Sequence, residues 1–295
     1  MPRVNLIPDN LDARNAEFEQ AALAEPVFLN SVPKSGTHLL RNILRMFVPV
    51  AQQYHAAFIQ YPILAQHAAA MDPAEPRLSW GHLLFSDVSA IAVYKARHIL
   101  LLRDPYDWVL ARARFFASDS FQGRVDHLKG RVVTPEDMLN MAIFGIPGKM
   151  PALQEIYTHN AAAWLGTAVN LVRFEDIKLH LEDLNSRAAE RFFTGLLGMC
   201  GIDPLPGDWR ARVLIGADRK QSGTARENLA GEGMDFPAEL PDTQKALVDY
   251  AAPGLRQLLG YAWGAGCPVR AAIPVLRNDL LPRRIRGRGR ATRRA

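Results

Sequence analysis

The chain has only two cysteines in 295 residues, Cys200 and Cys267, which excludes a disulfide framework as its main source of stability. No run of about twenty apolar residues interrupts the sequence, so we predict no membrane-spanning helix. The GxxxxGK[ST] motif of Walker-type proteins and the HExxH motif of zinc proteases are both missing. The eight histidines show no metal-ligand spacing, and we expect no metal site.

The apolar fraction is high enough for a well-buried core, because 48% of the residues are hydrophobic in a chain of ordinary single-domain length. The formal net charge of +5 comes from residues 277–295, where eight arginines accompany one aspartate. The rest of the chain has 27 basic and 29 acidic residues, a net charge of −2. We therefore expect one α/β domain over residues 1–276, followed by a basic, flexible tail over residues 277–295.

The arginine-rich tail has two interpretations. It is typical of an arm that binds an anionic membrane surface or another polyanion, and it is also typical of a segment that only keeps a protein soluble. The polar first twenty residues show no signal-peptide pattern. We expect a cytoplasmic protein, and the tail adds a peripheral position at the inner membrane surface as an alternative.

The most informative segment covers residues 27–40, VFLNSVPKSGTHLL, where an apolar run of strand type gives way to a polar turn and then to a helical pattern. The N–H groups at the start of such a helix favour a bound anion, and the lysine and hydroxyl groups of the turn add further donors. We predict an anion-binding turn, and an ordinary turn with a solvated lysine is the alternative. The residues of the predicted turn are Pro33, Lys34, Ser35, Gly36, Thr37 and His38.

A second informative segment covers residues 98–116, HILLLRDPYDWVLARARFF. Its apolar run has the length of a buried strand and ends at Arg103, after which Asp104 and Pro105 are typical of a helix start. Ligands of open α/β sheets bind at the carboxyl ends of the strands. Arg103 and Lys34 therefore predict two cations at one edge of a sheet, positioned for a polyanion. A salt bridge to a nearby carboxylate is the alternative role of Arg103.

Together these segments resemble the family of sulfotransferases that use the sulfate donor PAPS (phosphoadenosine phosphosulfate). PKSGT, residues 33–37, is similar to the family's loop for the donor's 5′-phosphosulfate, and RDPYD, residues 103–107, is similar to the signature whose arginine holds the 3′-phosphate. LVRFEDIK, residues 171–178, resembles the family's strand followed by a YED or FED turn. Motif order and spacing agree over residues 27–177. The resemblance implies PAPS as donor, PAP (phosphoadenosine phosphate) as product and no metal.

The resemblance also implies a catalytic histidine about twenty residues before the arginine of the second motif. His82 in LSWGHLLFS fits this place, since it precedes Arg103 by 21 positions. Histidine titrates near neutral pH and can take the proton of an acceptor hydroxyl as its oxygen attacks sulfur. His82 is the predicted base and Lys34 the predicted stabiliser of the leaving phosphate. His38 is the alternative base, and a half-buried structural role is the alternative for His82.

A basic segment over residues 217–233 resembles, loosely, the family's loop that closes over the 3′-phosphate of the donor. A solvated charged loop is the alternative interpretation. The residues of this segment that we predict to bind the donor are Arg219, Lys220, Ser222, Gly223 and Arg226.

Strand-type and helix-type segments alternate along the chain, which predicts an α/β fold with a central parallel sheet, helices on both faces and the phosphate turn after its first strand. We expect strands near Ser79, His98 and Val169 and an N-terminal helix over residues 10–23. Two stretches lack a long regular period and are the predicted acceptor-binding insertions. They are residues 54–76 and residues 117–149.

The predicted function is transfer of the sulfonate group from PAPS to a hydroxyl of a small-molecule, lipid or glycan acceptor. A P-loop-like kinase using ATP is one alternative. A nucleotide-binding protein without turnover is the other, because Ala111 stands where the family usually has a serine that contacts the 3′-phosphate. Magnesium dependence and nucleotide preference separate the two enzyme classes.

Overall fold

A five-stranded, entirely parallel sheet lies at the centre of the protein. The computed structural model describes residues 3–4, 8–222, 225 and 234–261. Within them the strand order is β3-β4-β2-β5-β7, and each neighbouring pair runs parallel. A separate antiparallel pair joins β1 to β6. The predicted α/β fold with a central parallel sheet is confirmed.

The bounds of the elements within the described residues are as follows. The strands are β1 (Arg3–Val4), β2 (Val27–Ser31), β3 (Ile59–Gln60), β4 (Leu78–His82), β5 (Arg97–Leu102), β6 (Phe121–Gln122) and β7 (Asn170–Arg173). The α-helices are α1 (Leu11–Asn15), α2 (Thr37–Arg45), α3 (Asp87–Val93), α4 (Pro105–Ala117), α5 (Pro135–Phe144), α6 (Leu153–Asn160), α7 (Phe174–Glu182), α8 (Arg187–Met199), α9 (Trp209–Ala217), α10 (Asp242–Ala251) and α11 (Leu255–Leu258). The 3₁₀ helices are η1 (Val50–Gln52), η2 (Tyr61–Met71), η3 (Asp126–Leu128), η4 (Ala162–Trp164) and η5 (Arg219–Gln221).

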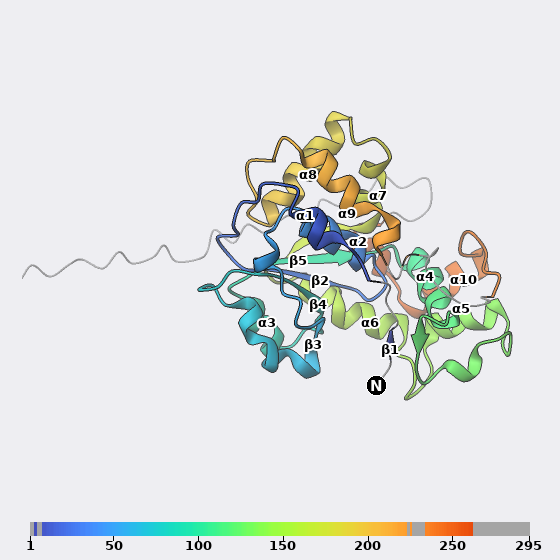
Figure 1. Cartoon of the computed structure of the whole chain (residues 1–295). Coiled ribbons are helices and arrows are strands. Elements are labelled where there is room, and N and C mark those ends of the chain that lie inside the picture. The colour runs from blue at the N-terminus through green and yellow to red at the C-terminus, as the bar shows by residue number, and fades with distance from the viewer. Residues whose placement is uncertain (1–2, 5–7, 223–224, 226–233, 262–295) are drawn as a thin grey trace, which may run out of the picture.

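Helices cover both faces of the sheet (Figure 1). In that view α1, α2, α8 and α9 lie above it and α3 and α6 below it, while α4, α5 and α10 gather at one end. Alternate side chains of a strand point to opposite faces of the sheet. Val27 and Leu29 of β2 pack in one apolar cluster, and Phe28 packs in the other. Because both faces are covered, the strand is buried at every position, which explains its continuous apolar run.

The carboxyl ends of the five parallel strands lie at one edge of the sheet. The register pairs Ser31 of β2 with Leu101 of β5, and Leu102 of β5 with Arg173 of β7. The turn after β2 and the start of α4 after β5 are therefore neighbours. Parallel pairing thus brings the first two sequence motifs together, as the sequence predicts.

The helix predicted over residues 10–23 is wrong, because α1 ends at Asn15. The side-chain amide of Asn15 donates to the carbonyls of Arg45 and Val48 at 2.6 and 3.0 Å. Farther along, the Leu23 N–H donates to Oε1 of Gln52 at 2.7 Å. Hydrogen bonds to distant segments replace the local ones that a longer helix would need.

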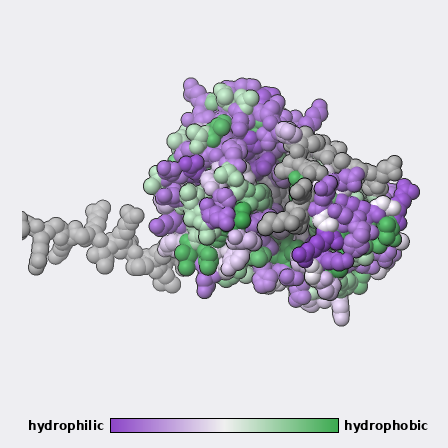
Figure 2. All heavy atoms as spheres, turned by 60° about the horizontal axis from the view of Figure 1, so that its bottom comes forward, coloured by the Kyte–Doolittle hydropathy of each residue, from purple (hydrophilic) through white to green (hydrophobic). Residues whose placement is uncertain are grey.

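The exposed surface in the view of Figure 2 is mainly hydrophilic, with apolar residues in small separate groups. No helix among the described residues is both long and apolar enough to cross a membrane. The predicted tail over residues 277–295 and the domain boundary before it lie outside the described residues.

Candidate active site

The turn between β2 and α2 has the geometry of an anion-binding site. Lys34 and Gly36 adopt positive φ angles of 69° and 91°, and the Ser35 N–H donates to the Val32 carbonyl at 3.1 Å. Among the described residues no side chain caps the N-terminus of α2, whose N-cap is Gly36. The first N–H groups of α2 have no acceptor within the helix, so they can bind an anion.

Gly36 is required where the turn meets α7. A Cβ atom at this position would lie 2.3 Å from Cδ2 of Phe174, and the positive φ also disfavours any other residue. Phe174 belongs to the FED segment that the sequence analysis singled out. The first and third motifs are therefore in direct contact.

Two donors from the second motif hold the turn in place. The indole Nε1 of Trp108, a fully buried residue of α4, donates to the Pro33 carbonyl at 2.5 Å. The guanidinium Nη1 of Arg103 donates to the Lys34 carbonyl at 3.4 Å. Trp108 could not be recognised from the sequence, because an aromatic residue on the apolar face of a helix is ordinarily a core residue.

Arg103 follows the last residue of β5, as predicted, and its guanidinium carbon lies 4.6 Å from the centroid of the Phe174 ring. Within the described part of the chain, no carboxylate lies at ion-pair distance from Arg103, and its buried Nε has no hydrogen-bond partner. A buried donor without a partner is costly. An anionic ligand can therefore give this guanidinium the ion-pair and hydrogen-bond partner that it lacks. The salt bridge that was the alternative role of Arg103 is not found among the described residues.

A polar cluster fixes the backbone that follows Arg103. The Asp104 N–H donates to Oε1 of Glu175 at 3.0 Å, and Tyr261 donates its hydroxyl hydrogen to Oε2 of Glu175 at 2.9 Å. The Asp104 carboxylate accepts two hydrogen bonds from Arg256, at 3.0 and 2.8 Å. Burial raises the pKa of Glu175 above its usual range. Arg256 and Tyr261 belong to no recognisable motif, and Arg256 lies 152 positions from Asp104. Their contacts with this cluster could therefore not be predicted from the sequence.

Lys34 has a strongly perturbed side chain. Its ammonium nitrogen lies 3.7 Å from the centroid of the Phe115 ring. Burial and the neighbouring Arg103 charge lower the pKa of Lys34 to about 7. Because the Lys34 amine is only partly protonated at pH 7, a bound anion that favours its protonated form is itself bound more tightly.

His82 is the last residue of β4, and its ring is fixed by β2. Nδ1 lies 2.9 Å from the backbone oxygen of Ser31 and 3.0 Å from its hydroxyl oxygen. A carbonyl oxygen only accepts, so Nδ1 carries the hydrogen and Nε2 keeps its lone pair. Burial and the Lys34 charge lower the pKa of His82 to about 4, which keeps the ring neutral at pH 7. The ring of Phe58 packs edge-on at a centroid distance of 4.6 Å.

The other polar groups of the turn are largely buried. Burial and the Arg41 and Lys34 charges lower the pKa of His38 to about 3. Ser35 Oγ is buried without a hydrogen-bond partner in the described part of the chain. Thr37 Oγ1 lies 2.8 Å from the hydroxyl of Ser31, which links the start of α2 to the residue that holds His82.

The basic segment is described only at its beginning. Arg219 and Lys220 are exposed residues of η5, which lies beside the middle of α2. Gly223 and Arg226 lie outside the described residues. The donor-binding roles of Arg219, Lys220 and Ser222 stay predictions.

Within the described residues, no group of three or more His, Cys, Asp or Glu side chains could hold a metal ion. No family model and no curated protein sequence matches this chain.

Several solved structures resemble the fold. Mouse sulfotransferase SULT7A1 complexed with PAP is 16% identical, with a TM-score of 0.47 over 86% of this chain and 84% of that chain. Retinol dehydratase in complex with androsterone and the inactive cofactor PAP is 13% identical, with a TM-score of 0.47 over 84% of each chain. The sulfotransferase domain from the curacin biosynthetic pathway is 13% identical, with a TM-score of 0.40 over 82% of this chain and 99% of that chain.

Proposed function

We propose that this chain is a PAPS-dependent sulfotransferase that transfers the sulfonate group to a hydroxyl of a small-molecule, lipid or glycan acceptor. The observation that carries the proposal is the distance of 3.4 Å between Nη1 of Arg103 and the Lys34 carbonyl, because it joins the anion-binding turn to a second cation. A donor that carries a 5′-phosphosulfate and a 3′-phosphate on one ribose needs two neighbouring anion sites of this kind. The sequence motifs at Lys34 and Arg103 resemble those of the family.

In this proposal His82 is the general base. Nε2 takes the proton of the acceptor hydroxyl while the acceptor oxygen forms a bond to sulfur. The bond between sulfur and the bridging oxygen of the donor breaks, and PAP departs with the electron pair. Lys34 and the N–H groups at the start of α2 stabilise the charge that develops on the departing phosphate. Positioning and electrostatics supply most of the catalysis, as in phosphoryl transfer.

The surroundings of Lys34 support an acceptor site next to the turn. The ring of Phe115 beside its ammonium belongs to a small apolar cluster with Phe121, Val125 and Met150. Phe121 and Val125 lie in residues 117–149, one of the two predicted acceptor-binding insertions. An acceptor bound against this cluster would have its hydroxyl close to the groups that act on the donor.

Calorimetric titration without magnesium tests the donor assignment. We expect wild-type protein to bind PAP more tightly than ATP or AMP, and Arg103→Ala to lose the preference for PAP over AMP, because AMP lacks the 3′-phosphate. Labelled PAPS is then offered with panels of phenols, lipid alcohols and glycans. Sulfonated product from any panel supports the enzyme.

Two outcomes would contradict the proposal. Preference for ATP, or equal affinity for PAP and AMP, would favour a kinase or another nucleotide-binding protein. Tight PAP binding without turnover of PAPS on any acceptor would favour the nucleotide-binding protein without catalysis.

A further inference from the structure

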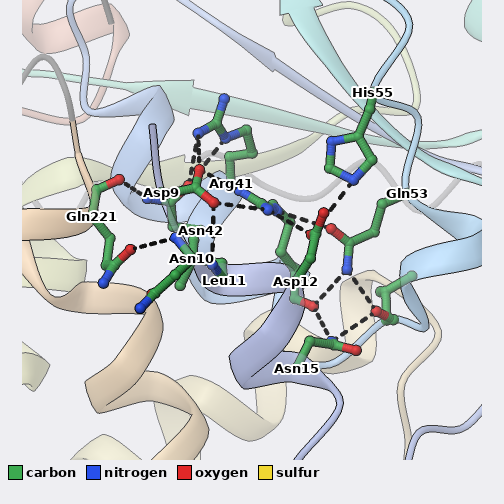
Figure 3. Close-up of polar contacts among 12 residues, drawn as sticks. Asp9, Asn10, Leu11, Asp12, Asn15, Arg41, Asn42, Gln53, His55 and Gln221 are labelled. Atoms are coloured by element: carbon green, nitrogen blue, oxygen red, sulfur yellow. Dashed lines mark hydrogen bonds and ion pairs between the residues drawn. The ribbon is translucent and has the colours of Figure 1, made fainter. Parts of the chain in front are cut away.

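Gln221, the last residue of η5, connects two segments that are far apart in sequence. Its side-chain Oε1 accepts from the Asn10 N–H at 3.1 Å, and its backbone carbonyl accepts from Nδ2 of Asn42 at 3.0 Å (Figure 3). The first contact ties η5 to the N-terminal segment, and the second ties it to α2. Gln221 therefore attaches the beginning of the basic segment to two other parts of the protein.

Asn42 is a rigid anchor for this attachment. It is fully buried in α2, and its Oδ1 accepts from Nε and Nη2 of Arg41 at 3.1 and 2.9 Å. The preceding helix α9 approaches α2 very closely here, because a Cβ atom on Gly216 would lie 2.5 Å from Cα of Ile43. Asn42 is five residues after Thr37, which places it about 7.5 Å along the helix from the anion-binding end.

The N-terminal segment is held equally firmly on the other side of Gln221. Asp9, next to Asn10, accepts from Nη1 and Nη2 of Arg45 at 2.8 and 3.1 Å, and it lies 3.6 Å from Nη2 of Arg41 (Figure 3). Arg45 also donates to Asp12 at 2.7 Å and is itself only 4% exposed. Because the side chains of Arg45 and Asp9 are only 4% and 19% exposed, their ion pair fixes the backbone around Asn10 more strongly than a surface pair would.

We propose that Gln221 is a positioning residue for donor binding: it fixes η5 between the N-terminal segment and α2, so that Arg219 and Lys220 are held near the 3′-phosphate of the donor. The inference rests on the proposed function and on the donor-binding roles that the sequence predicts for Arg219 and Lys220. It also assigns residues 9–10 and Asn42, which lie outside the sequence motifs, the role of holding Gln221 in position. Gln221 itself contacts neither the donor nor the acceptor.

The test compares affinity for PAP with affinity for AMP, which differ by the 3′-phosphate alone. Gln221→Ala removes the side-chain contact with Asn10, and Asn42→Asp replaces the amide donor that faces the Gln221 carbonyl with an acceptor. We expect each variant to lower the PAP-to-AMP affinity ratio about three- to tenfold, the effect of one lost hydrogen bond. The KM for PAPS should rise by the same factor, with kcat at saturating PAPS changed less than about twofold.

Gln52→Ala is the matched control, because Gln52 makes a similar set of hydrogen bonds away from η5, to the N–H and carbonyl of Leu23 and the carbonyl of Pro76. It should lower Tm without changing the PAP-to-AMP ratio. If Gln221→Ala and Asn42→Asp keep the wild-type ratio, or lower both affinities equally, the inference is wrong while the proposed function stands. If wild-type protein does not distinguish PAP from AMP, the proposed function fails first, and the inference fails with it.

Discussion

The ammonium group of Lys34 lies against the ring of Phe115, 3.7 Å from its centroid, instead of against a carboxylate. Its own carbonyl oxygen accepts from Arg103, so a second positive charge is close by. No ion pair of Lys34 occurs among the described residues. Phe115 provides only a weak cation–π contact, and the site therefore holds positive charge that an anionic ligand can compensate.

This arrangement predicts that PAP affinity depends on pH through Lys34. Its pKa of about 7 in the free protein is below the ordinary lysine value, and a bound anion raises it. Below pH 7 Lys34 is already charged and affinity is at its maximum. Above pH 7 binding must first restore the proton, so the Kd for PAP should rise by up to about tenfold per pH unit. Calorimetry at several pH values measures this slope together with the uptake of a proton.

Lys34→Arg provides the comparison for the pH experiment. A guanidinium keeps its charge throughout this range, so the slope above pH 7 should disappear even if affinity falls. A slope that persists in Lys34→Arg would assign the titration to another group.

His82→Ala should reduce kcat about 10²- to 10⁴-fold while PAP affinity stays within threefold of wild type, since the base acts on the acceptor. The neutral ring is the active form, so kcat/KM should be retained between about pH 4 and pH 7, where Lys34 also keeps its charge, and fall as the pH drops through about 4. His180→Ala is the control, because His180 stacks on Phe192 in α7 and α8. Turnover near the wild-type rate in His82→Ala would remove the histidine from the mechanism.

Trp108→Phe should destabilise the protein by about 1–3 kcal/mol, because the Pro33 carbonyl would lose its indole donor. It should also weaken PAP binding, since that bond holds the anion-binding turn. Trp164→Phe is the matched comparison: its indole donates to the Leu83 carbonyl at 3.2 Å, which also accepts from Asn30. Denaturant unfolding and PAP titration of both variants separate lost stability from lost binding. Equal PAP affinities in the two variants would contradict a specific role for Trp108.

Gly81→Ala should destabilise the sheet at the strand that carries His82. The added Cβ would lie 1.9 Å from the Ile59 carbonyl oxygen, so β3 must move away from β4 at a cost of about 1–3 kcal/mol or more. Gly166→Ala is the control, because a Cβ there meets no atom within 4 Å among the described residues. Urea unfolding measures the difference, and equal stability of the two variants would show that the sheet edge adapts freely.

Several parts of the site could be predicted because they depend on residues close together in sequence. Asp104 caps α4 through the Tyr106 N–H at 3.0 Å, and Pro105 follows at the first helical position. The apolar run of β5 is buried from its second residue onward. The N-terminal helix was predicted too long because its end depends on distant residues. The side-chain amide of Asn15 donates to carbonyls of α2 and of the loop after it, and no local sequence pattern encodes such partners.

By itself the sequence determined the turn over residues 33–38, the strand β2 before it and the position of Arg103 at the end of β5, since apolar periodicity, glycine and proline act over a few residues. Only the tertiary structure decided which distant groups complete the site. Parallel pairing of β2 with β4 and β5 brought His82 to Ser31 and Arg103 to Lys34. Packing of α11 brought Arg256 to Asp104. Such contacts follow from how whole strands and helices bury their apolar faces, which no single spacing along the chain records.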